Sequence, residues 1–246
     1  MTGAVLVAAS HGTSDPAGQR AVAALVSTVA ERVTDFRVRE AFVDVQTPDV
    51  SAVLDSISAT PVVVVPLLLS SGYHVRVDLA RVASAAANPT VVVTDALGPD
   101  PRLVSILERR LADIALADDD VLVLAAAGSS DGRAVDDCRL VAAALGERLG
   151  RAVQAAFISA AQPELKSAIS QARADGAPRV VVVSYLLAPG YFADLAAAAG
   201  GDVTTPPLLI DGDPAPAELV DIVIERYQAA HVSGVLPTPL DRAPTV

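Results

Sequence analysis

The 246-residue chain carries a formal charge of −11 and is 52% apolar but only 3% aromatic. A broad surface for nucleic acid or anionic membranes is therefore excluded, and the core must consist of aliphatic side chains. The length suits one large domain or two of ordinary size. A single cysteine, Cys138, excludes an internal disulfide and is compatible with a reducing compartment. Because no basic region precedes a long apolar stretch at the N-terminus, we predict no signal peptide and expect a cytoplasmic protein.

The first half of the chain alternates short apolar runs with helical stretches. Four consecutive valines, Val62–Val65, favour a strand buried on both faces, and Asp15 before Pro16 marks the start of a helix. Alternation of this kind is typical of βαβ units and a mostly parallel sheet. The predicted strands span 4–9, 37–45, 61–69 and 90–95, and the predicted helices span 16–33, 48–58, 75–87 and 101–116.

The same pattern starts again after a polar segment, residues 117–120. We therefore predict an α/β protein of two parallel-sheet domains, 1–116 and 121–230. Residues 231–246, which contain three prolines and no apolar period, are predicted to form a loose tail. In the second half the predicted strands span 121–127, 152–158, 179–187 and 203–210, and the predicted helices span 131–149, 163–174, 192–199 and 214–230.

The restart is an internal repeat. Val5–Asp15 corresponds to Val121–Asp131, and Pro66–His74 corresponds to Ser184–Phe192. Apolar strands and glycines persist in both copies, which indicates that they serve the fold. Three ionisable side chains are lost in the second copy: His11 becomes Ala127, Asp44 becomes Ser159 and His74 becomes Phe192. We therefore place the chemistry in the first half and predict a supporting role for the second.

His11, Asp44 and His74 each follow a predicted strand. Ligands of parallel α/β sheets bind beyond the carboxyl ends of the strands, so we expect the three residues near one another. Two imidazoles and a carboxylate suit a divalent ion such as Fe, Co, Ni or Zn, and an incomplete shell leaves positions for water or a substrate. An imidazole can also accept protons at neutral pH. Taken singly, each residue is equally compatible with a solvated strand end.

Other polar groups give weaker signals. Gly12–Ser14 has the composition of an anion-binding turn at a helix start, but its counterpart Gly128–Ser130 persists in the half without histidines. A turn required by the fold explains both copies. His231, near the tail, is assigned no role. Four arginines are candidate partners for an acidic ligand, although a solvated helix face explains each of them: Arg20, Arg76, Arg81 and Arg102.

At these positions the sequence resembles the sirohydrochlorin chelatases, the metal-inserting enzymes of sirohaem and cobalamin synthesis. The resemblance covers the whole chain as two tandem chelatase-like domains, with the functional motifs in the first domain. The matching segments are Ser10–Thr13, Ala41–Asp44 with Pro48, Pro66–Leu69 with Gly72–His74 and Asp78, and Leu97–Pro101.

The resemblance implies two parallel-sheet lobes that face a cleft. It implies that His11 and His74 hold the incoming ion, that one of them accepts pyrrole protons, and that Asp44 occupies the acidic position of the second strand. It implies no organic cofactor, sirohydrochlorin as the partner, and Co²⁺, Fe²⁺ or Ni²⁺ as the metal substrate. A monomer is compatible with two fused lobes. The residues that we assign to substrate binding are Ser10, Gly12, Thr13, Gly72, Tyr73, Arg76 and Asp78.

Two other functions remain open at this point. A histidine phosphatase also has a His-Gly pair after its first strand, but its chemistry requires an arginine directly before the histidine, where this chain has Ser10. A carrier of metal or tetrapyrrole would keep His11 and His74 without turnover. In the second half, Tyr191 and Phe192 are candidates for an apolar wall against a flat ring, and they are equally compatible with a core position.

Overall fold

The computed structural model describes residues 4–58, 60–70, 73–86, 88 and 90–232, and for residues 73–77 and 231–232 it describes the backbone alone. Within this range the chain forms two four-stranded parallel sheets with the strand orders β2-β1-β3-β4 and β6-β5-β7-β8. The predicted α/β class and the two similar lobes are confirmed. The strands are β1 (Val5–Ser10), β2 (Arg37–Phe42), β3 (Val62–Pro66), β4 (Val91–Val93), β5 (Val121–Ala126), β6 (Val153–Phe157), β7 (Val180–Tyr185) and β8 (Val203–Thr204).

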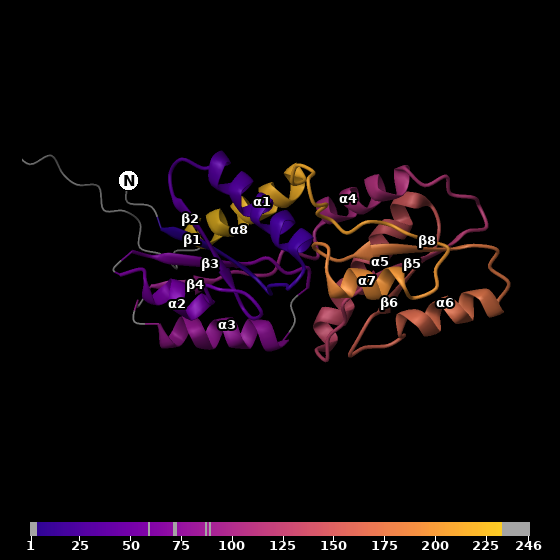
Figure 1. Ribbon diagram of the computed structural model, residues 1–246, viewed down its shortest axis with the longest axis horizontal. Coiled ribbons are helices and arrows are strands. Elements are labelled where there is room, and N and C mark those ends of the chain that lie inside the picture. The colour runs from indigo at the N-terminus through magenta and orange to yellow at the C-terminus, as the bar shows by residue number, and fades with distance from the viewer. Residues whose placement is uncertain (1–3, 59, 71–72, 87, 89, 233–246) are drawn as a thin grey trace, which may run out of the picture.

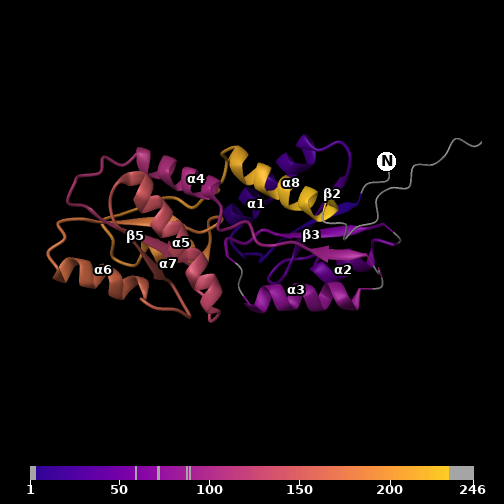
Figure 2. The same ribbon diagram turned by 180° about the vertical axis from the view of Figure 1, so that it is seen from behind.

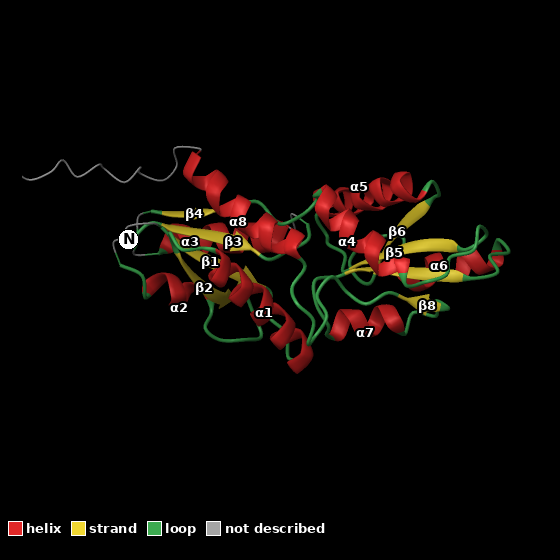
Figure 3. Ribbon diagram, turned by 90° about the horizontal axis from the view of Figure 1, so that it is seen from above, coloured by secondary structure: helices red, strands yellow, loops and turns green. Residues whose placement is uncertain are grey.

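Helices lie on both faces of each sheet (Figures 1 and 3). Several begin where the sequence provides an acidic N-cap: the carboxylate of Asp15 accepts from the Gly18 amide, and Asp131 does the same for Arg133. The helices are α1 (Pro16–Arg32), α2 (Val50–Asp55), α3 (Tyr73–Ala85), α4 (Pro101–Ala112), α5 (Gly132–Leu149), α6 (Leu165–Ala174), α7 (Tyr191–Ala197) and α8 (Ala217–Val232).

Prolines lie at the ends of two of the strands. β3 is buried throughout and finishes at Pro66, which lies opposite Ala9 of β1. A proline is tolerated at that position because it is the last residue of the strand. The predicted strand 203–210 is wrong for most of its length, since β8 ends at Thr204. Pro206 and Pro207 follow closely, and neither has an amide hydrogen to extend the ladder.

The last helix of each half packs against the other half. Helix α4 follows β4 in the chain but contacts α5 and β7, whereas α8 follows β8 but contacts α1 and β3. Figure 1 shows α8 beside α1 over the first sheet and α4 beside the second sheet, and the reverse view in Figure 2 agrees. The spatial lobes therefore differ from the sequence halves by one exchanged helix each.

Polar contacts at the exchange repeat with the pseudo-symmetry of the two halves. Arg110 of α4 donates to the carbonyl oxygens of Pro207 and Leu208, and its repeat counterpart Arg226 of α8 donates to those of Ala96 and Leu97. Two ion pairs repeat in the same way. Arg102 corresponds to Glu218 in the repeat and Arg109 corresponds to Glu225, so the pair Arg102–Glu225 is the pseudo-symmetric copy of the pair Arg109–Glu218. This reciprocity is the signature of an isologous interface, here within one chain.

The exchange also merges the hydrophobic cores. One buried cluster includes Leu25 of α1, Leu107 of α4, Leu145 of α5 and Val223 of α8. The outer faces have separate clusters, one under α2 and α3 and one under α6 and α7. Because the central cluster belongs to both lobes, neither lobe completes its core alone. Among the described residues, no helix is both long and apolar enough to cross a membrane.

We expect the Leu107→Ala variant to destabilise the whole molecule rather than one lobe. Leu107 is fully buried in the shared core, so its truncation should lower the free energy of unfolding by about 2–5 kcal/mol. Urea unfolding followed by circular dichroism and by tyrosine fluorescence should show one coincident transition at a lower midpoint. Leu140→Ala, at a side chain that is 60% exposed, is the control and should change stability by less than about 0.5 kcal/mol. Two separate transitions, of which Leu107→Ala moves only one, would contradict the shared core.

Candidate functional site

The carboxyl ends of the two sheets face each other. Tyr185, the last residue of β7, donates its hydroxyl to the carbonyl oxygen of Leu69, which follows β3 in the other lobe, at 2.8 Å. Gly18 of α1 lies against the Pro189 carbonyl, and a Cβ at Gly190 would stand 3.0 Å from Thr13 Oγ1. The loops after β1, β3 and β7 therefore meet at one junction, which is the edge where parallel sheets bind ligands.

His11 and Asp44 lie side by side at this junction. The backbone of Asp44 donates to the carbonyl oxygen of His11 at 2.9 Å, directly after the β1–β2 ladder ends. Both residues are exposed. The Asp44 carboxylate accepts from the Val45 amide at 2.8 Å, which orients it within its loop. The expected proximity of these two residues is confirmed.

Gly12 is required by the turn that follows His11. Its φ is +92°, and a Cβ there would overlap the carbonyl oxygen of Asp44. The amide of Thr13 donates to Gln46 Oε1 at 2.9 Å, and the amide of Asp15 donates to Thr13 Oγ1 at 3.1 Å. These donors already have partners within the protein, so the geometry supports a structural turn and gives no support to an anion site.

The second copy of the turn is built in the same way. Gly128 has a φ of +94°, and a Cβ there would overlap the carbonyl oxygen of Ser159. The amide of Asp131 donates to Ser129 Oγ at 3.0 Å, as Asp15 does to Thr13. The interpretation that the fold requires both turns is confirmed.

Ser10, the last residue of β1, is 4% exposed. Its Oγ is one of two buried side-chain oxygens without a hydrogen-bond partner among the described residues, and the other belongs to Ser184 of β7. Buried hydroxyls normally have partners. The repeat counterpart of Ser10 is Ala126, which shows that the strand end itself does not require a hydroxyl.

The structure describes only part of the second predicted motif. Gly72 and the side chains of Tyr73, His74 and Arg76 lie outside the described residues. The backbone places His74 in the first turn of α3, and the amide of Leu67 donates to the Ala9 carbonyl, so the chain leaves β3 beside the end of β1. This topology brings the start of α3 to the same sheet edge as His11.

The remaining charged candidates have nearby partners of opposite charge. Asp78 forms an ion pair with Arg81 one turn away at 3.8 Å. The guanidinium group of Arg20 donates two hydrogen bonds to the carboxylate of Asp211 in the second lobe, and the bond from its Nε is 2.9 Å long. Arg102 pairs with Asp100 and Glu225. Among side chains that the structure describes, no group of three His, Cys, Asp or Glu residues could hold a metal ion.

Two aromatic side chains stand at the junction on the second lobe. Tyr191 is 71% exposed and Phe192 is 37% exposed, and their rings meet edge to face with centroids 5.8 Å apart. They begin α7 directly after Gly190, the residue beside Thr13. The core position that the sequence also allowed for them is therefore excluded. Exposed neighbouring aromatics next to a candidate site suggest an apolar ligand surface.

The family model CbiX matches residues 5–114 and 121–198, which together make up most of the chain and correspond to its two repeats. The chain belongs to the CbiX family. The resemblance drawn from the sequence motifs is thereby confirmed. No curated protein sequence is significantly similar to this member of the CbiX family.

Solved structures show the same fold over nearly the whole chain. SirB from Bacillus subtilis, solved with Fe³⁺, is 23% identical with a TM-score of 0.73 and covers 95% of this chain and 98% of its own. The sirohydrochlorin chelatase SirB from Bacillus subtilis subspecies spizizenii, in complex with cobalt, is 20% identical with a TM-score of 0.72 over 94% and 97%. CbiX, the terminal enzyme of sirohaem biosynthesis in denitrifying bacteria, is 24% identical with a TM-score of 0.65 over 90% and 98%.

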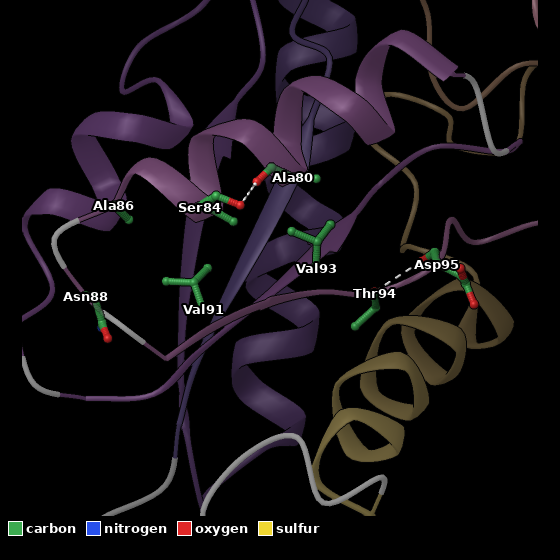
Figure 4. Close-up of a pocket in the computed structure, with 9 residues that line it drawn as sticks. Ala80, Ser84, Ala86, Asn88, Val91, Val93, Thr94 and Asp95 are labelled. Atoms are coloured by element: carbon green, nitrogen blue, oxygen red, sulfur yellow. Dashed lines mark hydrogen bonds between the residues drawn. The ribbon is translucent and has the colours of Figure 1, made fainter.

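This CbiX-family chain also has a groove away from its predicted site residues. The groove of ≈ 520 Å³ runs between α3 and the edge strand β4 (Figure 4). Short side chains such as Ala83, Val91 and Val93 line it, with Asn88 and Asp95 near its ends. The hydroxyls of Ser84 and Thr94 bond to backbone carbonyls nearby. Among the described lining residues, Asp95 is the one with an ionisable side chain.

Tyr185 is a contact of the site that was not predicted from the sequence. It ends an apolar strand that otherwise matches β3, and its counterpart in the first half is Leu67. Comparison of the repeats offered a signal for this contact, because Tyr185 has a hydroxyl at the end of an apolar strand where its counterpart Leu67 has none. The contact itself depends on how the lobes meet.

Substitution of the two turn glycines should have the same structural effect. In Gly12→Ala and Gly128→Ala the new methyl group is forced into a positive φ and against a carbonyl oxygen. We expect each variant to lose about 1–3 kcal/mol of stability, measured by urea unfolding. Gly132→Ala, where a Cβ would meet no atom within 4 Å, should be neutral or slightly stabilising. Wild-type stability in Gly12→Ala would show that the turn tolerates a side chain.

Proposed function

We propose that this protein is a sirohydrochlorin chelatase that inserts Co²⁺, Fe²⁺ or Ni²⁺ into the tetrapyrrole. The observation that carries the proposal is the exposed His11 and Asp44 at the junction of a two-lobed CbiX-family fold. Similar structures of SirB contain Fe³⁺ or cobalt, which supports a metal ion as substrate. The proposal assigns the chemistry to residues 1–116 and a supporting role to residues 121–230.

Metal insertion exchanges two protons for one divalent ion. The two ring N–H groups of the macrocycle lose their protons, the four ring nitrogens bind the ion, and the ion gives up its water and protein ligands. A site with too many strong ligands would retain the ion, so a small number of imidazole ligands suits transfer. In this proposal His11 and His74 hold the ion, and one of the two imidazoles accepts the two pyrrole protons in turn and passes each to solvent.

Asp44 has a supporting place in this mechanism. Its exposed carboxylate next to His11 adds negative charge where the cation arrives, which favours the bound ion. The direct ligands in this proposal are the two histidines, and the bond from the Val45 amide orients the Asp44 carboxylate within its loop beside His11. Ser10, Gly12, Thr13, Gly72, Tyr73, Arg76 and Asp78 remain proposed contacts of the macrocycle. The proposal includes a monomer in the cytoplasm, in keeping with the fused lobes and the single cysteine.

We expect His11→Ala to abolish metal insertion and to leave folding intact. The side chain is exposed, so its loss removes little packing. The rate of Co²⁺ insertion into sirohydrochlorin, followed by the absorbance change of the macrocycle, should fall by at least about 100-fold. His231→Ala provides a histidine control and should insert metal at the wild-type rate. An unchanged rate in His11→Ala would remove His11 from the mechanism, and a wild-type protein that binds both substrates without turnover would favour a carrier.

The second lobe can supply a wall for the flat ring. Tyr191 and Phe192 expose aromatic surface directly beside the turn that follows His11. A tetrapyrrole is a large π system, and stacking against aromatic side chains is favourable for such systems. The replacement of His74 by Phe192 in the repeat thus exchanges a proposed metal ligand for a proposed ring contact.

This division of labour predicts opposite effects in two variants. Phe192→Ala should weaken binding of metal-free sirohydrochlorin by about 1–3 kcal/mol, which is roughly 5- to 150-fold, and should spare Co²⁺ binding. His74→Ala should weaken Co²⁺ binding and spare the tetrapyrrole. Each ligand is titrated separately, and Leu140→Ala serves as a control for loss of an exposed apolar side chain. Unchanged tetrapyrrole affinity in Phe192→Ala would leave the second lobe as scaffold.

A further inference from the structure

The loop that leads from β3 to α3 is held by the opposite lobe. Tyr185 of β7 is 2% exposed, and its hydroxyl donates to the Leu69 carbonyl at 2.8 Å. Leu69 and Ser70 are the last described residues before α3 begins at Tyr73. This hydrogen bond therefore acts on the backbone four residues before the first residue of α3.

The neighbouring loop leaves space for this bond. A Cβ at Gly98 would stand 2.5 Å from the Tyr185 hydroxyl and would overlap the Leu69 carbonyl oxygen. At the preceding residue, the amide of Leu97 donates to the Leu68 carbonyl at 2.8 Å. The loop after β3 is thus tied at Leu68 by its own lobe and at Leu69 by the other lobe.

A second contact acts on the next residue. The Cys138 thiol of α5 is buried, and the burial raises its pKa to about 12, with a further rise from Asp137. A side-chain hydrogen bond with Ser70 acts in the opposite direction on that pKa. The hydrogen bond from Tyr185 thus holds Leu69, and the Cys138 thiol of the same lobe interacts with the next residue, Ser70.

The repeat shows that the fold does not require this arrangement. The counterpart of Leu69 is Leu187, whose carbonyl accepts from the Leu209 amide of the same lobe at 2.8 Å. The counterpart of Tyr185 is Leu67, and the counterpart of Cys138 is Val22. The polar groups occur only in the copy that faces the loop leading to His74. The second half thus lacks counterparts of His11, Asp44 and His74. It has instead two polar side chains, Tyr185 and Cys138, that contact the segment after β3.

We propose that Tyr185, assisted by Cys138, is a positioning residue that sets the place of His74 from the opposite lobe. The inference rests on the proposed function in so far as His74 serves as a metal ligand. Phenylalanine at position 185 would preserve the ring packing but leave a buried carbonyl without its donor, and the loop would have to move to satisfy it. Displacement of a ligand's support typically lowers metal affinity by tenfold or more.

The test compares two buried tyrosines. Tyr227→Phe is the matched control, because the Tyr227 hydroxyl also donates to a carbonyl of the first lobe, that of Ala4 at 2.9 Å, at the opposite end of β1. The chain has three histidines, so ¹H–¹³C spectra of their imidazoles can be assigned with His11→Ala and His231→Ala. We expect the His74 signal to shift in Tyr185→Phe and to stay at its wild-type position in Tyr227→Phe. Co²⁺ affinity should fall about tenfold in Tyr185→Phe alone.

The two readouts separate failure of this inference from failure of the proposed function. A wild-type His74 signal in folded Tyr185→Phe would overturn the positioning role, whatever the metal affinity. A shifted His74 signal with unchanged Co²⁺ affinity would support the positioning role and would count against His74 as a ligand. Should Tyr185→Phe fail to fold, Cys138→Val, which introduces the side chain of the repeat counterpart, gives the same test. The His74 signal should then shift, and an unmoved signal would overturn the inference.

Discussion

The exchange of the last helix between the two halves is the constraint on which the rest of the structure depends. Helices α4 and α8 each cover the sheet of the other half, so one hydrophobic cluster runs through both lobes. Arg110 and Arg226 secure the exchange by donating to backbone carbonyls in the opposite half. In this arrangement the loops after β1, β3 and β7 meet, through the Tyr185–Leu69 bond and the close approach of Gly190 to Thr13. The candidate site is a consequence of that geometry.

A symmetric scaffold carries chemistry that is not symmetric. Both halves keep the glycine turn, because Gly12 and Gly128 each sit at a positive φ against a carbonyl oxygen. His11 and His74 lie in the first half, and the exposed Phe192 takes the place of His74 in the second. Duplication lets one copy retain reactive groups while the other specialises in contacts to a ligand or to its neighbour. The polar contacts of Tyr185 and Cys138 with the first lobe fit such specialisation.

The elements with a strong local signal were predictable. Val62–Val65 form a buried central strand, and Asp15 caps α1, because β-branched runs and N-cap carboxylates act within a few residues of sequence. The pairing of His11 with Asp44 followed from the rule that parallel strands end at one edge. The prediction of β8 failed because Pro206 and Pro207 have no amide hydrogen to continue the ladder, although the residues around them are apolar. Tyr185 was missed because its partner lies in the other lobe.

The sequence by itself determined the α/β class, the repeat and the asymmetry of ionisable groups between the copies. These follow from periodicity and from direct comparison of one half with the other, and both are properties of the linear chain. Only the tertiary structure decided that α4 and α8 change lobes, that Tyr191 and Phe192 are exposed, and that Tyr185 reaches Leu69. An apolar helix buries the same area against either sheet, so its own pattern cannot specify which sheet it covers. That choice depends on complementary side chains far away in the sequence, such as Arg102 with Glu225, which meet only when the chain has folded.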